Sequence, residues 1–294
     1  MVTNALPHDL LDLFPYQPRF YQLDSNTTLG NLSFHYIDEG RGETLLMLHG
    51  NPTWSFYYRT LVKGLRDKYR CVVPDHIGCG LSDKPQKYNY TLAQHIDNLE
   101  ALIGHLQLKD ITLVVHDWGG AIGLGYAVRN PHNIKRLVLF NTAAFISGRI
   151  PFSINLCRLP VIGPMAIRCF NAFAGMALNW ACKRQECMTP KVKKGYLAPY
   201  NNYANRIAIL KFVQDIPLTQ AIPSYAIVKY IENRLDLLKN HPVMIIWGKM
   251  DFCFNDYFLE RWKQIYPQAE VHEVEDAGHY VVEDAYERII PWMR

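Results

Sequence analysis

The chain has 294 residues, of which 49% are hydrophobic and 20% are charged. This composition is ordinary for a soluble globular protein, and it excludes a disordered chain, a coiled coil and a collagen-like fibre. The net charge of +4 is too small to indicate a nucleic-acid-binding protein.

The charge is unevenly distributed along the chain. Residues 118–214 contain thirteen Lys or Arg and a single acid, Glu186, so this segment carries +12 and the remainder carries −8. Such an excess indicates either a solvated basic face or a surface that meets an anionic membrane or an acidic partner.

The seven cysteines are irregularly spaced, without a CxxC pair or a neighbouring His. We therefore expect reduced thiols and no metal site. Residues 1–20 lack an apolar run of signal-peptide length, and the uncharged stretch 169–182 is too short to span a bilayer. The sequence thus predicts a cytoplasmic protein without a transmembrane helix, and nothing in it calls for a cofactor.

Short apolar runs alternate with helix-like stretches through the first half of the chain. We expect helices over 91–106 and 120–129. We expect strands over five runs: 34–37, 45–48, 71–73, 111–115 and 137–140. Alternation of this kind predicts βαβ units and a mostly parallel, buried sheet flanked by helices, which is the α/β class.

The strand pattern stops after residue 144. Residues 145–222 are aromatic, interrupted by prolines and helix-like, and the strand pattern resumes at 243–247 and 270–274 before a closing helix over 280–293. This layout predicts a core formed by residues 1–144 and 223–294, with residues 145–222 inserted after strand six as a helical cap. We expect the cap to cover the carboxyl ends of the strands, where open α/β sheets bind their ligands.

The run HDWGG at 116–120 follows an expected strand and opens an expected helix. This is the context of a nucleophile elbow, a sharp turn that exposes one side chain above the sheet. Asp117 occupies the nucleophile position, and a carboxylate there attacks carbon to form an ester. The alternative is that Asp117 merely caps the following helix.

A second loop, HGNPTW at 49–54, directly follows another expected strand. In this kind of fold the corresponding loop helps to bind developing negative charge. The amide of Asn51 and the indole N–H of Trp118 are candidate donors to an anionic leaving group. Alternatively, Asn51 is a turn residue before proline and Trp118 is a packing aromatic.

The remaining catalytic candidates follow the last two expected strands. His279 is the candidate general base and Asp251 the acid that orients its imidazole. The order nucleophile, acid, histidine is typical of the α/β-hydrolase fold. Asp276 and, more weakly, Asp256 are rival acids, whereas His272 and His49 lie away from the position expected for the base.

Together, HGNPTW and HDWGG resemble the haloalkane dehalogenase branch of the α/β hydrolases, over nearly the whole chain. The resemblance implies that Asp117 is the nucleophile, His279 the base and Asp251 the acid, and that Asn51 and Trp118 hold the leaving halide or oxyanion. One subgroup of dehalogenases takes its acid from a Glu after strand six. Here residues 140–144 contain no acid, which favours the subgroup with the acid after strand seven.

Longer stretches resemble the cis-β-lactone decarboxylases of bacterial long-chain olefin biosynthesis. The stretches that carry this resemblance are 51–59, 73–85, 140–145 and 212–218. It implies conversion of a 3,4-dialkyl oxetan-2-one to a cis alkene and carbon dioxide, in company with other enzymes of that pathway. The alternative is a haloalkane dehalogenase that hydrolyses an alkyl ester of Asp117.

The expected cap supplies the apolar and aromatic residues that a channel for such a small apolar substrate needs, although a lid's own packing would look the same. These residues are Phe145, Ile150, Phe152, Ile154, Leu156, Val161, Ile162, Met165, Phe170, Phe173, Met176 and Trp180.

Two further functions stay open at this stage. An epoxide hydrolase uses two lid tyrosines, but Asn51 counts against it because that class usually has Phe there. The candidate tyrosines are Tyr196, Tyr200, Tyr203, Tyr225 and Tyr230. A ligand receptor with this fold is the non-enzymatic alternative, and the intact Asp117, His279 and Asp251 count against it.

Overall fold

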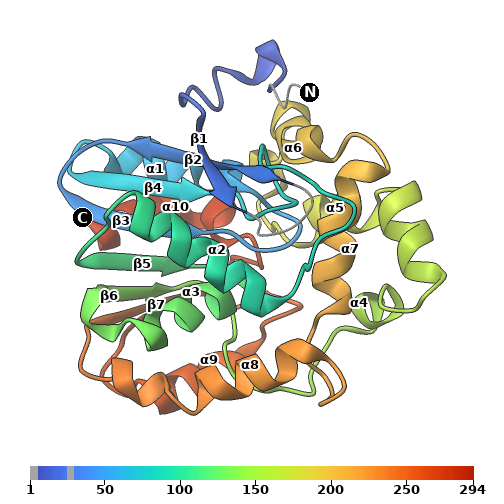
Figure 1. The fold of residues 1–294 in the computed structure, drawn as a ribbon. Helices are drawn as coiled ribbons and strands as arrows, with labels where there is room; N and C mark the ends of the chain where they lie inside the picture. The colour runs from blue at the N-terminus through green and yellow to red at the C-terminus, as the bar shows by residue number, and fades with distance from the viewer. Residues whose placement is uncertain (1–5, 25–29) are drawn as a thin grey trace.

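The inner strands of the central sheet carry consecutive apolar residues, so they are stable only when both faces of the sheet are covered. In β3 (Glu43–Leu48), Leu46 and Leu48 pack into the core on one face, and Leu45 and Met47 pack into the core on the other. The computed structural model describes residues 6–24 and 30–294, and it places helices on both sides of this sheet (Figure 1).

The eight-stranded sheet has the order β1-β2-β4-β3-β5-β6-β7-β8. The pairs β1·β2 and β2·β4 are antiparallel, and the other five pairs are parallel. Besides β3, the strands are β1 (Arg19–Asp24), β2 (Asn31–Glu39), β4 (Tyr69–Pro74), β5 (Ile111–Val115), β6 (Ile134–Leu139), β7 (Val243–Gly248) and β8 (Glu270–Val274). The predicted mostly parallel sheet is confirmed.

Two sets of helices cover the sheet. The set on one face comprises α2 (Leu92–His105), α3 (Trp118–Arg129), α8 (Pro223–Glu232) and α9 (Asp256–Ile265). The set on the other face comprises α1 (Arg59–Leu65) and α10 (Val281–Met293). Crossing a bilayer takes about 20 apolar residues, and no helix within 6–24 or 30–294 meets that need in length and hydropathy.

Of the five α-helices between β6 and β7, α8 covers a face of the sheet and the other four gather beside one end of it (Figure 1). They are α4 (Phe152–Leu156), α5 (Ala172–Trp180), α6 (Pro190–Leu197) and α7 (Ile207–Gln214). Their buried side chains, such as Leu178 and Tyr196, join the same apolar core as α1 and α10. We keep the name cap for residues 145–222; its exact bounds stay a prediction.

One strand, β1, was not expected from the sequence. It lies at the edge of the sheet, pairs only with β2, and buries a single residue, Leu23. An edge strand that exposes most of its side chains carries no apolar run, and this is the signal on which the strand predictions depended.

Candidate active site

The turn between β5 and α3 places Asp117 above the sheet. Asp117 has φ +49° and ψ −125°, a positive φ that is uncommon for a residue other than glycine. The turn is so tight that a Cβ on Gly119 would lie 2.2 Å from the carbonyl oxygen of Leu48. The strand, the strained residue and the close-packed glycine form the elbow expected from the sequence, and Asp117 does not act as a side-chain cap of α3.

The carboxylate of Asp117 is held by the loop after β3. Its Oδ1 accepts a hydrogen bond of 2.6 Å from the backbone N–H of Asn51. Burial raises the pKa of Asp117, while the nearby imidazole of His279 and the Asn51 N–H act in the opposite direction. The result is a carboxylate with little solvent around it, which is more reactive than a hydrated one.

His279 and Asp251 form a buried pair beside the nucleophile. His279 Nδ1 donates to Asp251 Oδ2 over 2.8 Å, and Asp251 Oδ1 accepts from the backbone N–H of Cys253. His279 Nε2 faces Asp117 Oδ2 at 3.8 Å. Burial alone would lower the pKa of His279, but the two carboxylates outweigh it, so the pKa of His279 is raised and its cation is favoured.

The rival acids lie elsewhere. Asp276 pairs with Arg288 and Asp256 pairs with Lys249, and both carboxylates are exposed. The other histidines are also otherwise engaged. His272 contacts Glu270 on the surface, and His49 is buried, with its Nδ1 facing the carbonyl oxygen of Gly50.

The two candidate donors to a leaving group, Asn51 and Trp118, lie beside the nucleophile position. The side-chain amide of Asn51 donates to the carbonyl oxygen of Ile209 over 3.2 Å, which leaves its second N–H hydrogen for a ligand. Asn51 and Trp118 both line a cavity that also contains Asp117 and His279. The structure thus brings together all five residues proposed from the sequence.

Two residues that organise the site were not identified from the sequence as functional. Asn141 follows β6; its carbonyl accepts the N–H of Asp117, and its side chain exchanges two hydrogen bonds with the backbone of Gly248. It therefore fixes the nucleophile turn to the strand that leads to Asp251. A polar residue directly after a buried strand is the signal that marks it.

The second is Asp284, whose buried carboxylate accepts backbone N–H groups from two distant segments. The donors are Gly278, beside His279, and Lys183 and Arg184 of the cap. The thiol of Cys182 donates to the same carboxylate. Gly278 lies 6 residues from Asp284, but Arg184 lies 100 residues away along the chain, so no local pattern could reveal the contact with the cap.

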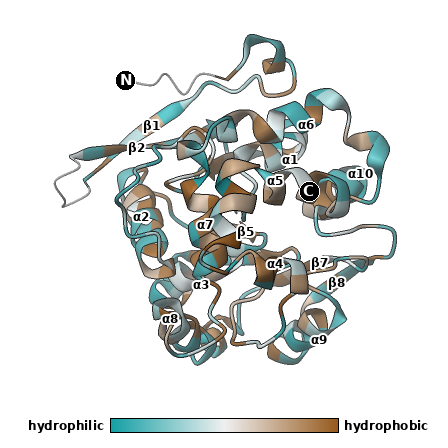
Figure 2. Ribbon diagram, turned by 90° about the vertical axis from the view of Figure 1, so that its right-hand side faces the viewer, coloured by the Kyte–Doolittle hydropathy of each residue, from teal (hydrophilic) through white to brown (hydrophobic). Residues whose placement is uncertain are grey.

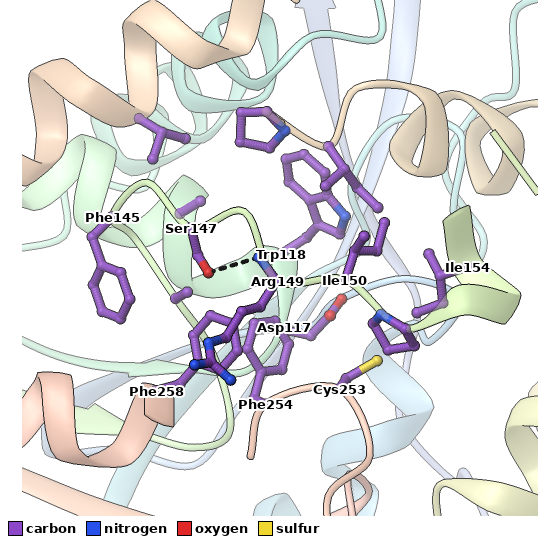
Figure 3. Close-up of a pocket in the computed structure, with 16 residues that line it drawn as sticks. Asp117, Trp118, Phe145, Ser147, Arg149, Ile150, Ile154, Cys253, Phe254 and Phe258 are labelled. Carbon is purple, nitrogen blue, oxygen red and sulfur yellow. Dashed lines mark hydrogen bonds between the residues drawn. The ribbon is translucent and has the colours of Figure 1, made fainter. Parts of the chain in front are cut away.

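Two cavities reach Asp117. The first, which we call the sheet-side cavity, has a volume of about 130 Å³ and is bordered by residues of α3, α8 and α9. Figure 3 shows Asp117 in its wall near Cys253 and Ile154. The second, the cap cavity, has a volume of about 240 Å³ and lies between the candidate catalytic residues and helices α4 and α5.

The apolar cap residues named from the sequence divide into two groups. Eight of them line one or both cavities: Phe145, Ile150, Ile154, Leu156, Ile162, Phe173, Met176 and Trp180. The other four are exposed on the surface: Phe152, Val161, Met165 and Phe170. The walls of the two cavities include none of the five tyrosines considered for an epoxide hydrolase, so the site offers no support for that chemistry.

A family model described as the alpha/beta hydrolase fold matches residues 43–286. The chain belongs to the α/β-hydrolase family. This α/β hydrolase is 48% identical to the cis-3-alkyl-4-alkyloxetan-2-one decarboxylase of Shewanella oneidensis, over 95% of its own chain and 87% of the relative. It is 43% identical to the decarboxylase of the same name from Xanthomonas campestris, over 90% of its chain and 91% of that relative.

The α/β hydrolase also superposes on the crystal structure of a putative ancestral haloalkane dehalogenase. The TM-score is 0.84 at 24% sequence identity, with 94% of this chain and 96% of the dehalogenase covered. This likeness shows the shared fold. The resemblance to dehalogenases and, more narrowly, to the lactone decarboxylases is therefore confirmed.

Proposed function

We propose that this α/β hydrolase converts a cis-3,4-dialkyl oxetan-2-one to a cis alkene and carbon dioxide, as a step in long-chain olefin biosynthesis. The observation that carries the proposal is the 48% identity, along nearly the whole chain, to a relative named for this reaction. The buried Asp117, facing His279 between apolar cavities, supports it.

The proposed reaction begins when an oxygen of Asp117 attacks ring carbon C4 and displaces the ring oxygen. The C4–O bond breaks with its electron pair on oxygen, which leaves an ester of Asp117 and a free carboxylate on C3. The bond between C3 and that carboxylate then breaks, carbon dioxide leaves, and the electron pair forms the C3=C4 double bond. Asp117 departs from C4 as the original carboxylate, so neither water nor a proton is consumed.

The stereochemistry of this route agrees with a cis product. Displacement from the rear inverts C4, and loss of carbon dioxide and Asp117 from opposite faces then restores the relation that the two alkyl groups had in the ring. Attack on the carbonyl carbon would give an anhydride and an alkoxide instead. That intermediate contains no carboxylate whose loss would expel Asp117.

In this route His279, Asn51 and Trp118 bind negative charge. The carboxylate released from the ring is new in the transition state, and donors aimed at it in a site without water stabilise it more than they stabilise the lactone. His279 serves best as a cation here, and Asp251 favours that form. In a dehalogenase the same imidazole would need to be neutral to activate water.

Single turnovers in ¹⁸O-labelled water test the proposed function. With a long-chain cis-oxetanone we expect equal amounts of alkene and carbon dioxide and no ¹⁸O in the peptide that contains Asp117, because no water attacks the ester. A haloalkane assay on the same preparation supplies the comparison. Rapid halide release, an ¹⁸O-labelled Asp117 and no alkene would instead establish the dehalogenase.

The dependence of rate on pH also separates the two reactions. Lactone decarboxylation needs Asp117 ionised and His279 protonated. The rate should therefore rise through a pKa of Asp117 above its ordinary 3.8 and fall through a pKa of His279 above its ordinary 6.5. Measurement of kcat/KM from pH 4 to 9 should give a bell-shaped curve, whereas a rate that increases through the His279 pKa would indicate hydrolysis.

We also propose that the cap contacts an anionic membrane surface. Six of the thirteen basic residues form ion pairs with acids outside the basic segment: Arg129, Lys135, Arg136, Arg184, Lys191 and Lys194. Arg149, Arg158 and Arg168 have no carboxylate partner in the part of the chain that the structure describes. They alternate along residues 149–170 with the exposed Phe152, Val161, Met165 and Phe170, and helices α4 and α5 are largely brown in Figure 2.

Co-sedimentation with phosphatidylglycerol vesicles tests this surface. We expect binding at low salt that weakens at high salt, since exposed charges lose reach beyond roughly 10 Å at 0.1 M salt. Phe152→Ser with Phe170→Ser should reduce binding, whereas Phe20→Ser, a control at an exposed Phe of β1, should not. Absence of vesicle binding, with capture of another enzyme of the pathway, would assign the face to a protein partner instead.

A further inference from the structure

The sheet-side cavity and the cap cavity meet at the nucleophile. Their walls share Asp117, Trp118, Ile154, Ile216 and Cys253, and the remaining lining residues of each are different. A group bonded to Asp117 therefore lies where two apolar spaces diverge. A single pocket ending at Asp117 would instead offer such a group only one apolar space.

Beyond the shared residues, each space has lining residues of its own, and cap residues such as Phe145 and Ile150 line the sheet-side cavity as well. Ala143 lines the sheet-side cavity together with Phe258 of α9, which comes after the cap in sequence. Ala177 lines the cap cavity together with Phe173, and both belong to α5 of the cap. Because Ala143 lines only the sheet-side cavity and Ala177 only the cap cavity, a change at one of them need not alter the other cavity.

We propose that the enzyme selects a substrate with two alkyl tails and holds one tail in each cavity. The identity of the reacting ring rests on the proposed function. In a cis-3,4-dialkyl oxetan-2-one the tails leave adjacent ring carbons, and with the ring at Asp117 each tail has its own apolar space. This assignment makes Ala143 and Ala177 specificity-determining positions, because each leaves room for one tail.

Matched substitutions separate the cavities. Ala143→Leu narrows the sheet-side cavity and Ala177→Leu narrows the cap cavity; both alanines are partly buried. Ala101→Leu on α2 is the control, since Ala101 is also partly buried and lines neither cavity. If a Leu variant does not fold, as judged by circular dichroism and thermal unfolding, the Val variant at the same position replaces it.

The first test uses two positional isomers of a lactone, one with a long tail at C3 and methyl at C4, the other with the tails exchanged. Each cavity variant should reject one isomer and keep the other, and the two variants should reject opposite isomers. We expect the ratio of kcat/KM for the isomers to change at least about tenfold in each direction, because each CH₂ left unburied weakens binding. Equal losses for both isomers in both variants would overturn the proposal while leaving lactone decarboxylation intact.

The second test does not depend on turnover. Ketones of equal carbon number, with the carbonyl in mid-chain or at carbon 2, have two tails or one, and quenching of tryptophan fluorescence reports their binding. The wild type and Ala101→Leu should prefer the mid-chain ketone, and each cavity variant should lose that preference. Equal affinity of the wild type for both ketones would refute two-tailed binding even if no lactone is converted.

Discussion

Replacement of Asp117 by Asn should lower the rate of lactone decarboxylation by at least about 10³-fold, because an amide cannot form the ester on which the reaction depends. Asn tolerates the positive φ of this position better than most residues. Its side-chain oxygen can still accept the N–H of Asn51. The loss of activity should therefore occur in a folded protein, measured as alkene formed per enzyme by gas chromatography.

The same variant has a predictable stability. Folding raises the pKa of Asp117. At a pH above that pKa, the ionised carboxylate therefore destabilises the folded protein relative to the unfolded chain. This destabilisation disappears as the pH falls through the pKa and the carboxylate becomes protonated. Asn carries no such cost, so the unfolding temperature of the variant relative to the wild type should be higher at pH 8 than at pH 4. Asp97→Asn, at an exposed ion pair on α2, is the control and should keep full activity. Substantial alkene formation by folded Asp117→Asn would remove Asp117 as the nucleophile.

Replacement of His279 by Gln should lower decarboxylation by about 10²-fold or more, since it removes the cation that faces the carboxylate released from the ring. In the proposed route this slows formation of the ester itself. Intact-protein mass spectrometry of the variant with excess oxetanone should therefore show mostly unmodified enzyme. His272→Gln, at a partly buried histidine of β8 remote from the site, is the matched control and should retain the wild-type rate.

A hydrolytic enzyme would behave in the opposite way. Without His279, water could not cleave the ester, and an alkylated Asp117 would accumulate to one per chain after one turnover. Accumulation of such an adduct from the lactone would show that His279 acts after ester formation. The assignment of His279 as a binding cation would then be wrong.

Features encoded in short stretches of sequence were predictable. The five early strand runs fall within or beside observed strands because the buried strands of this sheet carry several apolar residues in succession. Asp117 was recognised because a strand, an acid and two glycines in succession are sufficient to specify the turn. The other candidate catalytic residues, Asp251 and His279, followed from their places after β7 and β8.

Features that depend on side chains meeting across the fold were not predictable. The hydrogen bonds to Asp284 and the division of the apolar space into two cavities arise from segments far apart along the chain. The charge of +12 counted in the basic segment also overstates the positive charge of the surface, because acids elsewhere in the chain neutralise part of it. Lys191 and Lys194, for example, pair with Asp12 and Asp9 near the start of the chain.

The carboxylate of Asp284 restricts how the enzyme can open. It joins Gly278, next to His279, to Lys183 and Arg184 of the cap, and the N–H of Tyr280 donates to the carbonyl of Ala181 in the same place. If this part of the cap swung away, a buried carboxylate would lose its donors and the loop that carries the imidazole would be released. The cap is therefore anchored at the side of His279, so we expect substrate and product to exchange at another margin of the cap, around α4 and residues 149–163. The exposed side chains of Phe152 and Val161 lie on this margin. If both the proposed reaction and the proposed membrane contact hold, the alkene product would leave directly toward the lipid surface.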